Sequence, residues 1–100
     1  MNIEIKEQNG ACLGILTGWI DTADASQFLE DLKPLMAHAG RHIELDCSQL
    51  EYICSLGLRG LLKLKKESAD KGGSLVMTHV GGEVHKVLKI TGFDKLFDIR

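Results

Sequence analysis

The sequence contains one proline and no low-complexity segment, so nothing in it is typical of a disordered tail or an interdomain linker. Its three cysteines, Cys12, Cys47 and Cys54, are an odd number without a C-x-x-C pair, which predicts reduced thiols. No apolar run approaches the roughly 20 residues of a membrane span, and the N-terminus lacks the apolar core of a signal peptide. These absences predict a cytoplasmic protein.

A net charge of −2 provides no broad positive field, so direct binding of nucleic acid is not expected. The histidines show no metal-ligand spacing with the cysteines, and Gly81-Gly82 lacks the lysine and spacing of a phosphate-binding loop. We therefore expect no metal and no cofactor. One hundred residues, of which 44% are hydrophobic, predict one domain spanning residues 1–100. Alone, it is expected to be a monomer or a weak dimer.

Four segments have the pattern of strands. Ile3 to Glu7 alternates polar and apolar residues, and Asn9-Gly10 is a strong hairpin signal because both central positions of a type I′ turn need a positive φ. Residues 11–17 are nearly all apolar, as in a strand covered on both faces. Residues 42–46 and 74–79 predict two further strands, with residues 47–51 as a loop.

Three segments have helical periodicity. Asp21 to Asp24 supplies capping oxygens for a helix that runs to about Ala39, with Pro34 bending it and Gly40 ending it in a left-handed conformation. Its apolar stripe consists of Ala25, Phe28, Leu29, Leu32, Leu35, Met36 and Ala39. A second helix follows Ser55 and stops at residues 71–73. A third opens at residues 81–82 and ends at residues 91–92, before a short closing element.

The order of these elements predicts an α/β domain with a central mixed, mostly parallel sheet, an N-terminal hairpin and alternating helices. In such sheets functional groups gather beyond the carboxyl ends of the strands. Those ends carry Asp21, then Asp46 with Ser55, then His79. We therefore expect all four side chains at one edge of the domain.

Ser55 lies in the stretch Y-I-C-S-L-G-L-R-G-L-L, residues 52–62, between an apolar strand and a leucine-rich helix. Serine is a preferred helix N-cap because its oxygen accepts a hydrogen bond from an unpaired backbone N–H. A phosphoryl group at this position would also meet free N–H groups and the positive end of the helix dipole. A plain cap and a phosphorylated cap both fit the sequence.

The chain resembles a STAS domain, the fold of bacterial anti-sigma factor antagonists and of the cytoplasmic tails of sulfate transporters. The resemblance is carried by L-T-G-W-I-D-T, I-E-L-D-C-S-Q-L-E-Y-I, S-L-G-L-R-G-L-L, K-G-G-S-L-V-M and V-L-K-I-T-G-F-D-K-L-F, in that order. It implies that Ser55 is phosphorylated by an anti-sigma factor with serine kinase activity and that a serine phosphatase reverses the modification. It also implies that the unmodified domain binds the anti-sigma factor and thereby frees a sigma factor.

Five further residues are candidate partner contacts around Ser55. The resemblance implies an acidic position near the serine, which Asp21 matches. Trp19, at a strand exit, fits either core packing or an interface anchor, and Arg59 is within reach of a phosphate on Ser55. Cys54 stands where the family usually has aspartate, and Leu56 where it usually has serine or threonine.

Two other functions are compatible with the sequence. One is a STAS subunit that is never phosphorylated and holds a transport or signalling complex together. The presence of Cys54 in place of the family's usual aspartate favours this function. The other is a small hydrolase using Asp21, Ser55 and His79. The chain has no G-x-S-x-G motif and little length for a water-excluding active site, so we predict a binding protein, not an enzyme.

Overall fold

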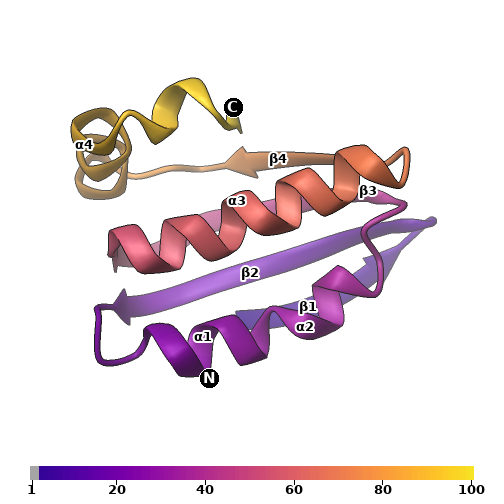
Figure 1. The fold of residues 1–100 in the computed structure, drawn as a ribbon, viewed down its shortest axis with the longest axis horizontal. Helices are drawn as coiled ribbons and strands as arrows, with labels where there is room; N and C mark the ends of the chain where they lie inside the picture. The colour runs from indigo at the N-terminus through magenta and orange to yellow at the C-terminus, as the bar shows by residue number, and fades with distance from the viewer. Residues whose placement is uncertain (1–2) are drawn as a thin grey trace.

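Five strands form one sheet, in the order in which they occur in the sequence (Figure 1). The computed structural model describes residues 3–100; residues 1 and 2 of the predicted domain lie outside this range. Strand β1 is antiparallel to β2, and the remaining neighbours are parallel. This confirms the predicted mixed sheet. The strands are β1 (Ile3–Gln8), β2 (Ala11–Ile20), β3 (His42–Ile53), β4 (Ser74–Thr78) and β5 (Asp98–Ile99).

The predicted hairpin joins β1 and β2. Asn9 and Gly10 have φ values of 50° and 81°, and Gln8 pairs with Ala11 across the turn. The two positive φ values are those that a type I′ turn requires. The hairpin register therefore follows directly from a two-residue signal in the sequence.

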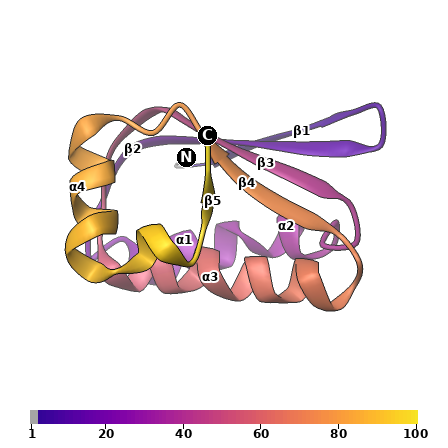
Figure 2. The same cartoon turned by 90° about the horizontal axis from the view of Figure 1, so that it is seen from above.

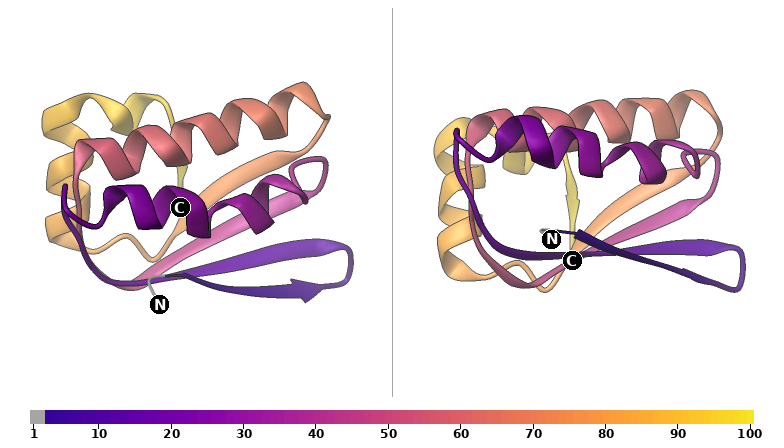
Figure 3. Two further views of the ribbon diagram at one scale, coloured as in Figure 1. Left: turned by 60° about the horizontal axis from the view of Figure 1, so that its bottom comes forward. Right: turned by 90° about the horizontal axis from the view of Figure 1, so that it is seen from below.

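The helices are α1 (Ala25–Asp31), α2 (Lys33–Met36), α3 (Ser55–Asp70) and α4 (Gly82–Thr91), followed by a short 3-10 turn, η1 (Phe93–Lys95). Figure 2 shows α1, α2 and α3 in one layer on one side of the sheet, with α4 at its end. Along β2, Cys12 and Leu16 on this side are buried, whereas Leu13 and Ile15 between them are only half-buried. The expectation that β2 is covered on both faces was therefore wrong, and its other face stays open (Figure 3).

The predicted helix of residues 22–39 is divided in two near its proline. Pro34 occupies the first turn of α2, where its missing N–H does no harm, and α1 ends at Asp31. The apolar stripe continues across the break, since Phe28 and Leu35 are buried, but Leu29 is 42% exposed and does not join the core. Gly40 is not among the residues with positive φ, so the left-handed ending predicted for it was also wrong.

Strand β3 is much longer than predicted and includes residues 47–51, which had been assigned to a loop. It pairs with β2 as far as Ile53, opposite Ile20, through two register shifts at which β3 carries an extra residue. Such bulges let a strand continue through polar residues such as Ser48 and Gln49, both of which are exposed. The extension places the carboxyl end of β3 directly before Ser55.

The other glycine signals are confirmed. Helix α3 ends with Gly72 at φ 80°, and helix α4 ends with Gly92 at φ 79°. The N–H of Gly73 donates to the carbonyl of Ser68 at 2.7 Å and that of Gly72 to Ala69 at 3.2 Å, the hydrogen bonds of a Schellman motif. The chain thus turns tightly from α3 into β4.

The alkaline stability of the fold is expected to depend on Cys47, a core residue that is 1% exposed. Burial, with a smaller contribution from the charge of Asp46, raises the pKa of its thiol to about 12. The unfolded thiol ionises near pH 9 and the folded one near pH 12, so its contribution to stability is complete below about pH 9 and is lost as the pH rises toward 12.

We expect the free energy of unfolding to decrease above pH 9 with a slope of the order of 1 kcal/mol per pH unit attributable to this thiol. Urea unfolding of the wild type and of Cys47→Ala at pH 8, 9 and 10 measures it. The other titratable groups are common to both proteins, so the difference between the two curves isolates Cys47. Parallel curves would show that the thiol makes no such contribution.

Candidate functional site

Ser55 is the first residue of α3 and is exposed to solvent. The predicted N-cap role was wrong by one residue: Cys54 is the N-cap, and no side-chain hydrogen bond caps the helix. Cys54 has the extended backbone of an N-cap (φ −80°, ψ 169°), and Ser55 is already helical, one residue earlier than predicted. Within residues 3–100, the hydroxyl of Ser55 has no hydrogen-bond partner, so it is free to react.

The amino end of α3 is fixed to the end of β2. The N–H of Cys54 donates to the carbonyl of Ile20 at 2.9 Å, and the N–H of Leu58 makes the first helical bond to the carbonyl of Cys54 at 3.0 Å. The backbone N–H groups of residues 55–57 therefore precede the helical ladder. They and the helix dipole form an environment that favours a negative charge on Ser55.

Gly57 allows α3 to lie this close to the sheet. A Cβ atom at this position would come within 2.8 Å of Ile53 Cγ1 and 3.6 Å of Ile20 Cγ2. Both isoleucines are fully buried. The glycine two residues after Ser55 thus packs the helix start against the ends of β2 and β3, and holds the serine at a defined position.

Asp21 follows β2 and is half-buried. Its Oδ1 accepts the N–H of Asp24 at 3.2 Å, while the N–H of Asp21 donates to Oδ2 of Asp24 at 3.5 Å. The two carboxylates thereby cap the turn that leads into α1, in the reciprocal manner of a capping box. No side-chain hydrogen bond caps α1 itself, whose N-cap is Asp24, so the predicted capping of this helix was wrong. Asp21 nevertheless stabilises the preceding turn, whether or not it contacts a partner.

Trp19 is 57% exposed and stacks on Tyr52, with ring centroids 4.6 Å apart and planes inclined by 25°. The two residues are paired across β2 and β3. Because their neighbours Ile20 and Ile53 face α3, the aromatic rings lie on the opposite face of the sheet. Of the two fates considered for Trp19, the structure supports a surface position at the same strand ends as Ser55.

The other three predicted contacts differ in exposure. Leu56 is 41% exposed, which is unusual for a large apolar side chain next to a helix start. Arg59 is also exposed, one helical turn after Ser55. Cys54 is only 6% exposed, so its thiol offers little surface to a partner.

Asp46 and His79 do not join Ser55, contrary to the expectation of a single edge. Nδ1 of His79 lies 3.5 Å from Oδ1 of Asp46, just after the end of β4, and Asp46 lies in the middle of β3. Ile53 follows Asp46 by seven positions along β3, which corresponds to roughly 20 Å of strand. A triad of Asp21, Ser55 and His79 is therefore not assembled, because β3 continues well beyond β4.

The pKa of the Asp46 carboxyl is lowered chiefly by the backbone N–H of Ser48, which it accepts at 2.9 Å, with a smaller contribution from His79. Burial acts in the opposite direction. Asp46 thus stabilises the first irregularity of β3 and has a local structural function.

Sequence reasoning missed Tyr52 as a site residue. Its pairing with Trp19 depends on the two register shifts of β3, which no local pattern indicates. The only available signal was that Trp19 and Tyr52 each come one residue before the end of a strand, which places both at the same end of the sheet but does not indicate that they pair.

No cluster of three or more histidine, cysteine, aspartate or glutamate side chains in residues 3–100 could hold a metal ion. Within the same range, no helix has both the length and the apolar character to cross a membrane.

The chain belongs to the STAS domain family: the family model described as "Mlab, STAS domain" matches residues 6–98. Among curated relatives, a Bordetella bronchiseptica protein provisionally named an anti-sigma factor antagonist, BtrV, is 29% identical over 99% of this chain and 85% of its own. The anti-sigma-B factor antagonist of Bacillus subtilis is 26% identical over 99% of this chain and 90% of its own.

Solved structures show the same fold. An anti-sigma factor antagonist from Mycobacterium paratuberculosis has a TM-score of 0.82 at 20% identity and covers 97% of this chain and 82% of its own. SpoIIAA in its unphosphorylated form has a TM-score of 0.76 at 14% identity, with 98% of this chain and 87% of its own covered. The Bacillus protein SpoIIAA is also known in a phosphorylated form, with a TM-score of 0.69, 14% identity and coverage of 98% of this chain and 90% of its own.

Proposed function

We propose that this protein is an anti-sigma factor antagonist whose binding to its partner is switched by phosphorylation of Ser55. The observation that carries the proposal is the exposed hydroxyl of Ser55 at the first position of α3, without a hydrogen-bond partner in residues 3–100. The names of the relatives support the class of function. The partner in this proposal is an anti-sigma factor with serine kinase activity, and a serine phosphatase restores the hydroxyl.

The surroundings of Ser55 fit a docking surface better than a catalytic pocket. Leu56 and Trp19 expose apolar area at the same end of the sheet, and Arg59 adds a positive charge. Aromatic side chains and arginine are typical anchors of protein interfaces. This arrangement supports a binding protein without catalysis of its own.

The proposal predicts that phosphate uptake depends on Ser55. Incubated with ATP and the cognate kinase, the wild type should gain the mass of one phosphoryl group, whereas Ser55→Ala should gain none. Intact-mass spectrometry measures the difference. The matched control is Ser26→Ala, because Ser26 is also an exposed serine in the first turn of a helix, α1. Equal uptake by wild type and Ser55→Ala would refute Ser55 as the acceptor.

A second candidate function is a STAS subunit that holds a transport or signalling complex together without modification. The observation that favours it is Cys54, which is buried and places no charge immediately before Ser55. In that case the wild type purified from its native cells carries no phosphate in any growth condition, and Ser55→Asp retains its partners. The same mass measurement thus separates the two candidates.

A further inference from the structure

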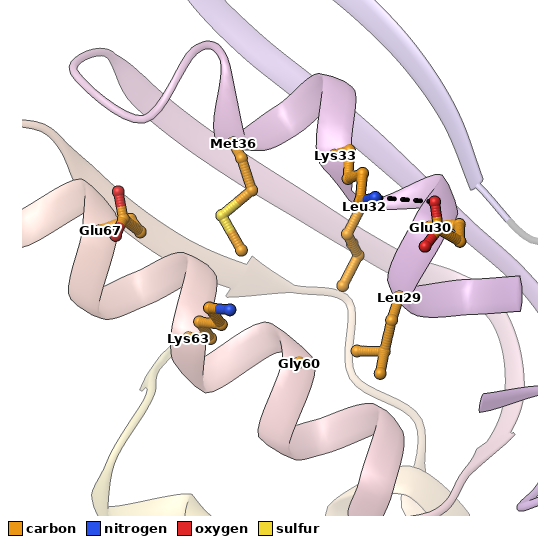
Figure 4. Close-up of a pocket in the computed structure, with 8 residues that line it drawn as sticks. All are labelled: Leu29, Glu30, Leu32, Lys33, Met36, Gly60, Lys63 and Glu67. Carbon is orange, nitrogen blue, oxygen red and sulfur yellow. Dashed lines mark ion pairs between the residues drawn. The ribbon is translucent and has the colours of Figure 1, made fainter. Parts of the chain in front are cut away.

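A groove of about 360 Å³ lies between helices α1 and α2 on one side and α3 on the other (Figure 4). Leu29, Leu32 and Met36 point toward α3, and Gly60 leaves the facing side of α3 without a side chain. Leu29 is 42% exposed although it faces this apolar surface. The groove therefore presents apolar area to solvent that neither the core nor a neighbouring element covers.

The charged residues that line the groove are Glu30, Lys33, Lys63 and Glu67; their charges sum to zero, but they differ in their pairing. Lys33 pairs with Glu30 at 2.9 Å, and Glu67 pairs with Lys71 at 3.6 Å. Lys63, on the groove side of α3 in Figure 4, forms no ion pair with any carboxylate in residues 3–100. The lining charge that has no ion-pair partner within residues 3–100 is therefore the positive charge of Lys63, although the whole chain carries −2.

Two residues next to the groove add to this positive charge. Arg59 and Lys66 follow the same side of α3, at steps of four and three residues from Lys63, and both are exposed. Neither forms an ion pair with a carboxylate in the described part of the chain. The positive strip therefore runs along α3 beside the apolar groove.

We infer that the groove docks an acidic amphipathic helix of a partner protein. A helix satisfies its own backbone hydrogen bonds, whereas an extended segment between two helices would find no strand edge with which to pair. From Gly60 to Glu67 the groove follows about 10 Å of α3, the length of two helical turns. Leucines spaced by three and four residues would fill it, and a neighbouring glutamate or aspartate would pair with Lys63.

A second copy of this chain is a poor occupant. Ile90 is its most exposed large apolar side chain, at 79%, and lies on α4 beside Lys86 and Lys89. Docking it in the groove would bring those lysines near Lys63. Like charges at such contacts oppose binding, so charge complementarity selects an acidic partner.

The face of α3 that lines the groove continues beyond Gly60 toward the start of the helix. Leu56, which is 41% exposed, lies one turn before Gly60 on the same helix face. A helix in the groove that extends toward the start of α3 would end beside Ser55. The inference nevertheless goes beyond the proposed function, because it needs neither a kinase nor a phosphate.

Two synthetic peptides of about 14 residues test it. They carry leucines at the same helical spacing and differ only in their flanking residues, glutamate in one and lysine in the other. The acidic peptide should bind, measured by fluorescence anisotropy, and should shift the amide signals of Leu29, Met36 and Lys63 in the labelled protein. The basic peptide should not bind.

Two variants and one control sharpen the test. Lys63→Glu should weaken binding of the acidic peptide by at least about tenfold. Gly60→Ala changes no charge, but the added Cβ meets the side chain of Leu29 and narrows the groove, so this variant should also weaken peptide binding. Its far-ultraviolet circular dichroism spectrum should remain that of the wild type. Lys86→Glu makes the same charge change on α4, outside the groove, and should have little effect.

Several results would overturn the inference. Equal binding of both peptides, no effect of Lys63→Glu, or amide shifts away from the groove would each contradict it. Preferential binding to phosphatidylserine vesicles would indicate a membrane surface, and self-association abolished by Lys63→Glu in sedimentation experiments would indicate a second copy. Because no arm involves Ser55 or ATP, failure here leaves the proposed function intact, and failure of phosphate uptake leaves the groove intact.

Discussion

Gly73→Ala is expected to lower the free energy of unfolding by about 3 kcal/mol, one of the largest effects of any single methyl group in this protein. A Cβ atom at Gly73 would overlap with the backbone carbonyl oxygens of Ala39 and Arg41 and lie 2.8 Å from Ser68 Oγ. The first two atoms belong to the backbone that leads into β3. They cannot rotate away as a side chain can, so either the α3–β4 turn or the start of β3 must move.

Neighbouring contacts make that movement costly. The N–H of Gly73 donates to the carbonyl of Ser68, and the N–H of Ser74 donates to the carbonyl of Arg41 at 3.2 Å. Ala39 and Ser68 are both fully buried. A shift of the turn therefore weakens the Schellman motif and the first bond between β3 and β4 together.

Urea unfolding followed by circular dichroism at 222 nm measures the loss. Gly82→Ala is the matched control, since a Cβ there has no atom within 4 Å and should leave stability nearly unchanged. The double variant Ser68→Ala/Gly73→Ala should recover only a minor part of the lost free energy of unfolding, because the overlaps with the carbonyl oxygens of Ala39 and Arg41 remain. A Gly73→Ala protein as stable as the wild type would mean that the α3–β4 turn is much more compliant than its contacts indicate.

The parts of the fold that the sequence predicted are those with local causes. Asn9-Gly10 determines a turn because two adjacent residues must have positive φ, and Gly72 and Gly92 end helices for the same reason. Gly40 is likewise a glycine at a predicted helix end, but it does not have a positive φ. Helix α2 already ends at Met36, so Gly40 is not the residue that follows its C-cap.

The errors arose where pairing between distant segments decided the structure. Ser48 and Gln49 are exposed polar residues that are typical of a loop, yet they lie within β3 because β2 supplies partners through two irregular steps. The same extension separated Asp46 from the site, and Cys54 instead of Ser55 became the N-cap of α3. Local propensity cannot predict a bulge whose cause is the neighbouring strand.

For the site, the sequence predicted that Ser55 lies between the end of a strand and the start of a helix, whereas its surroundings required coordinates. The stacking of Trp19 on Tyr52 depends on the strand register, and the exposure of Leu29 depends on how α1 and α2 lie against α3. A single sequence indicates which residues could lie near a helix start. It does not indicate on which face of the sheet each of them points.

Phosphorylation of Ser55 is expected to weaken binding of the anti-sigma partner by at least about a hundredfold while changing the stability of the domain much less. The phosphate adds about −1.5 to −2 charges. At the amino end of α3, in the free protein, this charge is favoured by roughly 0.3–1 kcal/mol. In a closed interface an unpaired buried charge costs roughly 3–5 kcal/mol. The second effect is larger, and about 1.4 kcal/mol corresponds to a tenfold change in affinity.

Isothermal titration with the phosphorylated and unmodified proteins measures the dissociation constants, and thermal unfolding of both measures stability. Ser26→Asp provides the matched control, because it adds charge to the first turn of α1 without touching Ser55, and should bind the partner as the wild type does. Arg59 is the residue that could offset the effect, since it lies one turn from the phosphate and is free of ion pairs within residues 3–100. If Arg59 neutralises the phosphate within the interface, affinity falls less than tenfold, and Arg59→Ala then restores the full loss. Unchanged affinity in both backgrounds would exclude a charge switch at this surface.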